Sequence, residues 1–175
     1  LWKTDGTLLG TKMVKNIAAG AVSSNPTELT VVTNGNVSTL FFVASDPRCL
    51  FKSDGTDAGT VQVQTVFILG VGQNPTNLTA FQGKLFFTAT NTFHSPVNPI
   101  IEERLFSSDG TQDGTQQVNN SPLAPRFLTV LGDKLMYSAI DANGRELWST
   151  SSNQSIRVKN INIVAGDGNP SNLIA

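Results

Sequence analysis

Short apolar runs recur along the chain, and the most apolar of them do not alternate with polar residues. Leu-Phe-Phe occurs at 40–42 and at 85–87, and Leu-Met-Tyr occurs at 135–137. A strand with one solvated face alternates apolar and polar side chains, so a continuous apolar run indicates a strand that is buried on both faces. No stretch keeps the spacing of an amphipathic helix over three turns. The pattern therefore predicts an all-β chain of short strands.

Two longer phrases recur with these runs and divide the chain into units. The phrase Leu-aromatic-x-x-Asp-Gly-Thr-x-x-Gly-Thr occupies 1–11, 50–60 and 105–115, and a degenerate copy begins at Glu146. The phrase Asn-Pro-Thr/Ser-x-Leu occupies 25–29, 74–78 and 169–173, with a degenerate member at 125–128. Self-similarity at intervals of 42 to 55 residues indicates a repeat architecture.

Each unit predicts four strands separated by Gly, Asn, Asp and Pro residues. In one complete unit the first strand is expected to follow the Asn-Pro turn, and the four strands are placed at 78–81, 84–90, 104–108 and 116–118. Their length and their β-branched and aromatic content are typical of strands. A small sheet that is buried on both faces and repeated predicts blades stacked around an axis, which is a β-propeller. A β-sandwich is the alternative, but it would not need the same turn sequence in every unit.

We therefore expect a segment of a β-propeller made of four-stranded antiparallel blades, about three of them complete, with partial blades at both ends. The expected divisions are a partial blade with the last two strands over 1–24, blades over 25–73, 74–121 and 122–168, and the first strand of a further blade over 169–175. A closed ring needs at least four blades. Further blades are therefore expected from a longer chain or from a neighbouring subunit.

The Asp-Gly-Thr turn has a structural explanation in its residue types. Gly accepts a positive φ, Asp hydrogen-bonds to nearby backbone groups, and Thr hydroxyls cap a loop. The alternative is a calcium loop, because Asp57 and Asp113 supply second carboxylates in two copies. However, the first copy has Leu8-Leu9 there, and a hard cation needs six or more oxygens. We expect no metal and no cofactor, and we assign a structural turn to Asp5, Gly6, Thr7, Asp54, Gly55, Thr56, Asp109, Gly110 and Thr111.

Composition and charge exclude several classes of function. Charged residues make up 14% of the chain and its net charge is −1, without a run of Lys or Arg, so nucleic acid is not an expected partner. No apolar run approaches the roughly 18 residues of a membrane span. Cys49 is the single cysteine, so an internal disulfide is impossible. With no evident Cys or His partner, Cys49 is interpreted as a substituted strand residue.

The phrases at 1–7 and 146–148 resemble the ELWxxDGT repeat of bacterial proteins. The continuation Gly-Thr-x-x-Val-Lys-Asp-Ile of that family is similar to Gly10–Ile17, and the resemblance covers essentially the whole chain. The departures are Phe in place of Trp in two copies and Ser151-Ser152-Asn153 in place of Asp-Gly-Thr, which predicts a rebuilt and shorter turn. The resemblance implies a large, exported or surface-associated bacterial protein, and it carries almost no information about activity.

Loop lengths separate the scaffold from a candidate site. The interval between second and third strands varies most, with 8 residues from Phe42 to Leu50, 18 from Phe87 to Leu105 and 10 from Tyr137 to Leu147. In a propeller these loops share one face with the connections between blades, and binding residues concentrate on variable loops. The candidate binding residues on this face are His94, Glu102, Glu103, Arg104, Asp141 and Arg145.

These candidates favour binding over catalysis. His94 is the single histidine, and the chain has no Gly-x-Ser-x-Gly motif. Glu102 and Glu103 are adjacent in a strand, so they point to opposite faces and cannot flank one glycosidic bond. We expect a non-enzymatic scaffold or binding module that presents variable loops to a protein or a surface glycan. Two alternatives stay open: a structural subunit of a filament or larger assembly, and a fragment of a propeller enzyme acting on polysaccharide.

Overall fold

The fold is taken from a computed structural model of the chain. It describes residues 1–18, 20, 22–45, 48–63, 71–93, 100–161, 166 and 168–174. Every regular element in these ranges is a β-strand. Within these ranges, no helix is long and apolar enough to cross a membrane. The prediction of an all-β chain is confirmed.

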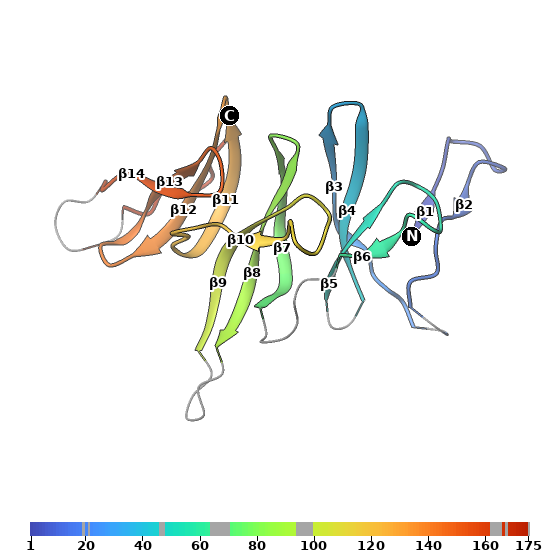
Figure 1. Ribbon diagram of the computed structural model, residues 1–175, viewed down its shortest axis with the longest axis horizontal. Coiled ribbons are helices and arrows are strands. Elements are labelled where there is room, and N and C mark those ends of the chain that lie inside the picture. Colours follow the sequence, from blue (N-terminus) through green and yellow to red (C-terminus); the bar gives the residue numbers. More distant parts are fainter. Residues whose placement is uncertain are drawn as a thin grey trace.

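The described strands form three four-stranded antiparallel sheets and one two-stranded sheet (Figure 1). Sheet I consists of β3 (Thr27–Asn34), β4 (Val37–Ala44), β5 (Cys49–Ser53) and β6 (Val61–Gln62). Sheet II consists of β7 (Val71–Phe81), β8 (Lys84–Phe93), β9 (Ile100–Ser108) and β10 (Gln116–Gln117). Sheet III consists of β11 (Leu123–Leu131), β12 (Lys134–Asp141), β13 (Gly144–Thr150) and β14 (Ser155–Lys159). The two-stranded sheet pairs β1 (Trp2–Lys3) with β2 (Lys12–Met13).

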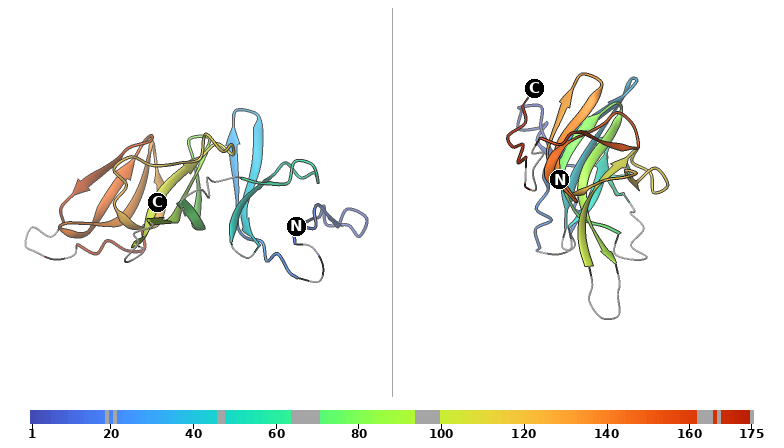
Figure 2. Two further views of the ribbon diagram at one scale, coloured as in Figure 1. Left: turned by 60° about the horizontal axis from the view of Figure 1, so that its bottom comes forward. Right: turned by 90° about the vertical axis from the view of Figure 1, so that its left-hand side faces the viewer.

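In each four-stranded sheet, four consecutive strands pair in sequence order. This confirms the predicted four-stranded antiparallel unit. Sheet II begins at Val71, slightly before the expected division at residue 74. The sheets stand in a row in chain order, with the two-stranded sheet at one end and sheet III at the other (Figures 1 and 2). The row is open and does not close into a ring.

Apolar cores hold consecutive sheets together. Leu1 and Ile17, from the segment of the two-stranded sheet, pack against Phe42, Ala44, Cys49 and Phe51 of sheet I. The side of each sheet that points toward the next sheet along the chain is called its forward face, and the opposite side its backward face. The forward face of sheet I packs against the backward face of sheet II through Val32, Phe41, Leu50, Val63, Leu85, Phe87, Ala89 and Phe106. The forward face of sheet II packs against the backward face of sheet III through Phe81, Phe86, Leu105, Val118, Leu135, Tyr137 and Ala139.

The continuous apolar runs are explained by this arrangement. In β8, Leu85 and Phe87 belong to the core shared with sheet I, whereas Phe86 belongs to the core shared with sheet III. All three side chains are buried. The inference that the second strand is covered on both faces is therefore confirmed for sheet II.

The Asn-Pro phrase was expected to form a turn before the first strand, and this prediction is wrong for sheet II. Asn74 and Pro75 lie inside β7. The pairing of β7 with β8 is interrupted by register shifts on both sides of Thr76. Asn74 and Asn77 have φ values of 50° and 56°, which is left-handed backbone. These residues insert bulges, so the strand continues through the phrase instead of starting after it.

The same pair of left-handed residues, three positions apart, occurs in every copy of the phrase. The pairs are Asn25 with Glu28, Asn74 with Asn77, Ala124 with Phe127, and Asn169 with Asn172. Asn tolerates this conformation far better than Ala or Phe does. The degenerate copy has thus kept the backbone shape after losing the residues that favour it.

A threonine that follows the bulge joins neighbouring first strands. The Thr30 hydroxyl donates to the Leu78 carbonyl oxygen at 3.2 Å. The equivalent Thr129 hydroxyl donates to the Leu173 carbonyl oxygen at 2.8 Å. Residues 169–173 are therefore held beside β11 by the contact that also joins β7 to β3.

Replacing Ala124 by Asn is expected to stabilise the protein. Ala124 has a φ of 48°, and Asn occupies three of the four equivalent positions. A non-glycine residue in this region costs roughly 1–2 kcal/mol, and Asn recovers part of that cost, so we expect a gain of about 0.5–1 kcal/mol. Thermal unfolding followed by circular dichroism measures the change. The control is Ala58→Asn, in an exposed turn with ordinary backbone; an equal gain there would contradict the explanation.

Candidate functional site

The Asp-Gly-Thr turn is closed by its own side chains. In the second copy, the Asp54 Oδ1 atom accepts from the backbone N–H of Thr56 at 2.9 Å and from its hydroxyl at 2.7 Å. The Thr56 Oγ1 atom in turn accepts from the Gly59 N–H at 2.9 Å. The Thr60 hydroxyl donates to the Thr56 carbonyl oxygen at 2.6 Å. The motif residues thus bind one another.

The first and third copies repeat these bonds. Asp5 and Asp109 accept from the N–H and the hydroxyl of Thr7 and Thr111. Thr7 and Thr111 accept from Gly10 and Gly114. The first glycine of the motif has a φ of 89°, 86° and 87° in the three copies, which only glycine adopts readily.

The second glycine of the motif is required by the aspartate. A Cβ atom on Gly10, Gly59 or Gly114 would lie 1.8, 2.1 or 2.0 Å from the Oδ1 atom of the motif aspartate. No side chain fits at that distance. The carboxylate therefore occupies the space that the missing side chain leaves, and this explains why the phrase contains two glycines.

The hydrogen bonds of the turn also set the protonation of its aspartates. The Thr7 hydroxyl and backbone N–H lower the pKa of Asp5 below its ordinary value, and the Thr56 groups do the same for the pKa of Asp54. For Asp109 the Thr111 hydroxyl is the main cause of the lowered pKa.

Within the described ranges, no group of three or more His, Cys, Asp or Glu side chains could hold a metal ion. The geometry supports a structural role for the turn.

The degenerate fourth turn is shorter, as the sequence predicts, and it contacts the preceding sheet. It runs from Thr150 at the end of β13 to Ser155 at the start of β14. The Asn119 N–H donates to the Asn153 carbonyl oxygen at 3.0 Å, and the Ser155 N–H donates to the Asn119 carbonyl oxygen at 2.9 Å. The shortened turn thus pairs its backbone with the segment that follows β10.

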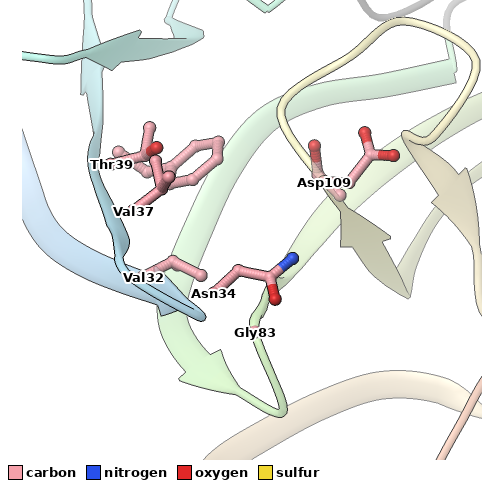
Figure 3. A pocket seen from close by; sticks show the side chains of 8 residues that line it. Val32, Asn34, Val37, Thr39, Gly83 and Asp109 are labelled. Carbon is pink, nitrogen blue, oxygen red and sulfur yellow. The ribbon is translucent and has the colours of Figure 1, made fainter.

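Two pockets lie between consecutive sheets on the side of the Asp-Gly-Thr turns. The first has a volume of about 210 Å³ and is lined by Val32, Asn34, Val37, Thr39, Phe41, Gly83, Ser108 and Asp109. Figure 3 shows the Asn34 amide close to Gly83, with the Asp109 carboxylate across the pocket. The second has a volume of about 310 Å³ and is lined by Phe81, Gln82, Lys84, Phe86, Ser107, Ser151, Ser152 and Asn153. Sequence reasoning missed both because each combines the first hairpin of one sheet with the turn of the next.

The acidic and basic candidates of sheet II lie in a strand. The third strand was expected to begin at Arg104, at the end of a long variable connection, but β8 extends to Phe93 and β9 begins at Ile100. The Arg104 guanidinium forms an ion pair with Glu102 at 2.6 Å, and it also donates to the Ser121 carbonyl oxygen. Glu103 accepts from the Thr88 hydroxyl at 3.2 Å. The two glutamates thus have different partners, consistent with opposite faces of the strand.

The candidates of sheet III form a separate group. Asp141 forms an ion pair with Arg157 at 2.9 Å and accepts from the Asn143 N–H at 2.7 Å. Arg145 donates to the Ala124 carbonyl oxygen at 3.0 Å. The structure therefore places the described candidates in two groups, each bonded mainly within its own sheet. His94 lies outside the described residues.

The position before the Leu-aromatic pair has a role that the sequence did not indicate. Glu146 is fully buried, and its Oε2 atom accepts from the Ile161 N–H at 2.8 Å. Arg104 holds the equivalent position in sheet II and binds the main chain at Ser121. Both side chains therefore bind the chain that leaves their own sheet. Cys49 has this position in sheet I, where burial raises the pKa of its thiol and disfavours a reactive thiolate.

No protein-family model, curated protein or solved structure matches the chain. The resemblance to ELWxxDGT repeats therefore rests on the motif residues alone and stays a prediction. The geometry of the turns explains why that motif recurs, whichever family carries it.

The contact between Asp54 and Gly59 predicts strong coupling between two substitutions. Gly59→Ala forces the Asp54 carboxylate away and breaks its bonds to Thr56, so we expect a loss of about 1–3 kcal/mol in the free energy of unfolding. In an Asp54→Ala background the added methyl group meets no carboxylate. A double-mutant cycle by urea unfolding should give a much smaller loss for Gly59→Ala in that background, and additive losses would refute the proposed contact.

The lowered pKa values predict an acid-sensitive component of stability. The folded-state pKa of Asp5, Asp54 and Asp109 lies below the ordinary 3.8, so the unfolded chain binds protons first on acidification. The stability that these aspartates contribute is fully present above their pKa in the unfolded chain. It is lost as the pH falls through their lower pKa in the folded protein. We expect a triple Asp→Asn variant at these positions to lose less stability than the parent between about pH 6 and about pH 3. Equal losses in urea unfolding would contradict the assignment.

Proposed function

We propose that the chain is a segment of a β-propeller that serves as a non-enzymatic scaffold or binding module. Its sheets act as blades, and the connections between second and third strands are presented to a protein or glycan partner. The observation that carries this proposal is the repeated packing of sheets through the same positions, combined with turns whose polar groups bind each other.

The blade arrangement is supported by two repeated contacts. Forward and backward faces pack in the same way between sheets I and II and between sheets II and III. First strands are joined by the hydroxyls of Thr30 and Thr129. Lys3 also joins the first copy of the turn to the second, since its ammonium donates to the Gly55 carbonyl oxygen at 2.7 Å. A contact that recurs between neighbours is the property from which a propeller or another stacked array is built.

The binding role is supported by the contrast between turns that are alike in three copies and connections that differ from one sheet to the next. The Asp-Gly-Thr turns have one geometry in three copies, and their carboxylates are used internally. The connections at the opposite end of the sheets differ in length and carry charged residues. Among the described charged candidates, Glu102 pairs with Arg104 and Asp141 pairs with Arg157, and these two separate ion pairs suit a polar surface. An acid and a base placed around one bond would favour the alternative of a propeller enzyme.

The exported, surface-associated setting rests on the resemblance to bacterial repeat proteins. The low charged fraction of 14% is compatible with it. In this proposal the chain is part of a larger repeat protein whose further blades complete the ring.

The proposal predicts that binding depends on the variable connections. The labelled chain is applied to a panel of bacterial surface glycans and to isolated surface proteins. Replacing residues 94–99 by a Gly-Ser segment of equal length, together with Glu102→Ala and Arg104→Ala, should abolish binding, because this removes the longest connection and its adjacent ion pair. The control carries Asp57→Ala and Gln112→Ala in the turns of the opposite side. Binding that survives the first set contradicts the proposal, and hydrolysis of a polysaccharide in the same panel would favour the enzyme.

A further inference from the structure

Equivalent positions line the pocket between sheets I and II and the pocket between sheets II and III, but their charges differ. Thr39 and the Asp109 carboxylate lie on opposite sides of the first pocket (Figure 3). Aligning the Leu-Phe-Phe runs makes Lys84 the equivalent of Thr39. Aligning the Leu-aromatic pairs makes Ser151 the equivalent of Asp109. In the second pocket, which Lys84 and Ser151 line, an ammonium group thus replaces a hydroxyl and a hydroxyl replaces the carboxylate.

The second pocket is also the larger one, because a serine in its wall replaces a lysine. The third-strand position two residues after the leucine holds Lys3, Lys52 and Ser107 in successive copies. The Lys3 ammonium binds the Gly55 carbonyl oxygen of the next turn at 2.7 Å. The Lys52 Nζ atom lies 3.5 Å from the place that a Cβ atom on Gly110 of the next turn would occupy. Ser107 is too short to reach the next turn, and the pocket volume is about 310 Å³ instead of about 210 Å³.

The polar groups of the second pocket are not used within the protein. The Ser107 side chain is 5% exposed and lines the pocket, and its hydroxyl has no hydrogen-bond partner among the described residues. In the same part of the chain, the exposed Lys84 ammonium forms no hydrogen bond and no ion pair. Ser151 and Ser152 add exposed side chains, and the Asn153 Oδ1 atom is buried without a partner. The shortened turn therefore lacks the internal bonds that close the Asp-Gly-Thr turns.

The rest of the wall and the volume limit what the pocket can hold. Phe81 and Phe86 supply an apolar wall, and their rings pack edge to face with centroids 5.6 Å apart. Small-molecule sites have volumes of roughly 300–1,000 Å³, so a pocket at the lower limit suits an occupant with a single ring. The ammonium group favours an anion, the hydroxyls favour a hydroxylated ligand, and the phenyl rings favour an apolar C–H face.

From these groups we propose that the pocket between sheets II and III binds an acidic monosaccharide unit, such as a hexuronate. The sugar carboxylate pairs with the Lys84 Nζ atom and accepts from the Ser107 hydroxyl. The ring hydroxyls bond to the turn at 151–153, and the C–H face of the ring lies against Phe86. The first pocket does not take this ligand, because Asp109 repels an anion. This site lies on the side of the Asp-Gly-Thr turns, so the inference is independent of what the variable connections bind.

The affinity is limited by the surroundings of the ammonium group. The pKa of Asp109 is lowered mainly by the Thr111 hydroxyl and to a smaller extent by Lys84, so the field of the ammonium also acts on that carboxylate. An exposed ion pair contributes modestly because water screens it. We therefore expect a dissociation constant for glucuronate on the order of 1 mM.

The test is a titration of the ¹⁵N-labelled 175-residue chain with sodium glucuronate, followed by amide chemical shifts. We expect saturable shifts gathered at Lys84, Ser107 and residues 151–153. Glucose is the matched neutral sugar and should bind about 10-fold more weakly or less, because it lacks the carboxylate. Sodium sulfate supplies charge without a ring and should also bind more weakly. Absence of saturable shifts at these residues, or equal affinity for glucose or sulfate, would overturn the proposal.

Two variants distinguish binding in the pocket from general attraction to positive charge. Lys84→Thr introduces the residue of the first pocket and should weaken glucuronate binding by about 5-fold to 10-fold. Ser107→Lys places in the wall the lysine of the other copies and should abolish binding, although it adds a positive charge. The matched control is Lys134→Thr, which removes the same charge from the equivalent hairpin position of sheet III and should leave binding unchanged.

Unfolding temperatures verify that each variant is folded. The lysine at 107 should be accommodated, because Lys3 and Lys52 occupy the equivalent position in other copies. Binding that is retained or strengthened in Ser107→Lys would contradict the assignment to this pocket. Equal losses in Lys84→Thr and Lys134→Thr would contradict it as well.

Discussion

Burial of a strand on both of its faces is the constraint from which the rest of this structure follows. The β8 strand carries apolar side chains on consecutive positions, so a single packed partner would leave half of them in water. Leu85 and Phe87 are covered by sheet I, and Phe86 is covered by sheet III. A four-stranded sheet with such a strand at its centre buries all of these side chains only when it lies between two others. The stacking of sheets is therefore a consequence of the second strand, and the outer sheets of any open row have one uncovered face.

The turns serve this stacking by keeping the third and fourth strands in register. The aspartate, threonine and two glycines of each turn form one closed set of hydrogen bonds around a carboxylate. Where this set is lost, at Ser151–Asn153, the shorter turn pairs instead with the backbone of Asn119. The motif thus specifies a local shape, and its loss in one copy is compensated by a contact between sheets.

Much of the fold could be predicted from the sequence, because the apolar runs and turn residues report local geometry directly. The strands of each unit, their antiparallel order and the double burial of the second strand followed from such signals. The bulged first strand did not, because Asn-Pro is a common turn signal and only the pairing with β8 shows that β7 continues through it. The pockets and the role of Glu146 depend on residues from two sheets or from distant segments, and a single sequence gives no signal for those contacts. The third strand was predicted to begin at Arg104, four residues too late, because nothing local showed how far β9 extends toward Ile100.

Native-state hydrogen exchange tests most directly whether burial on both faces organises the molecule. The backbone amides of β8 lie in sheet II, which packs against a four-stranded sheet on each side, whereas sheet I has only the two-stranded segment on its backward side. They should exchange only through global unfolding and should be the slowest in the chain, whereas amides of β11 and β14 in sheet III should exchange faster through local opening. Protection that is highest in sheet III, or equal in all three sheets, would contradict the account.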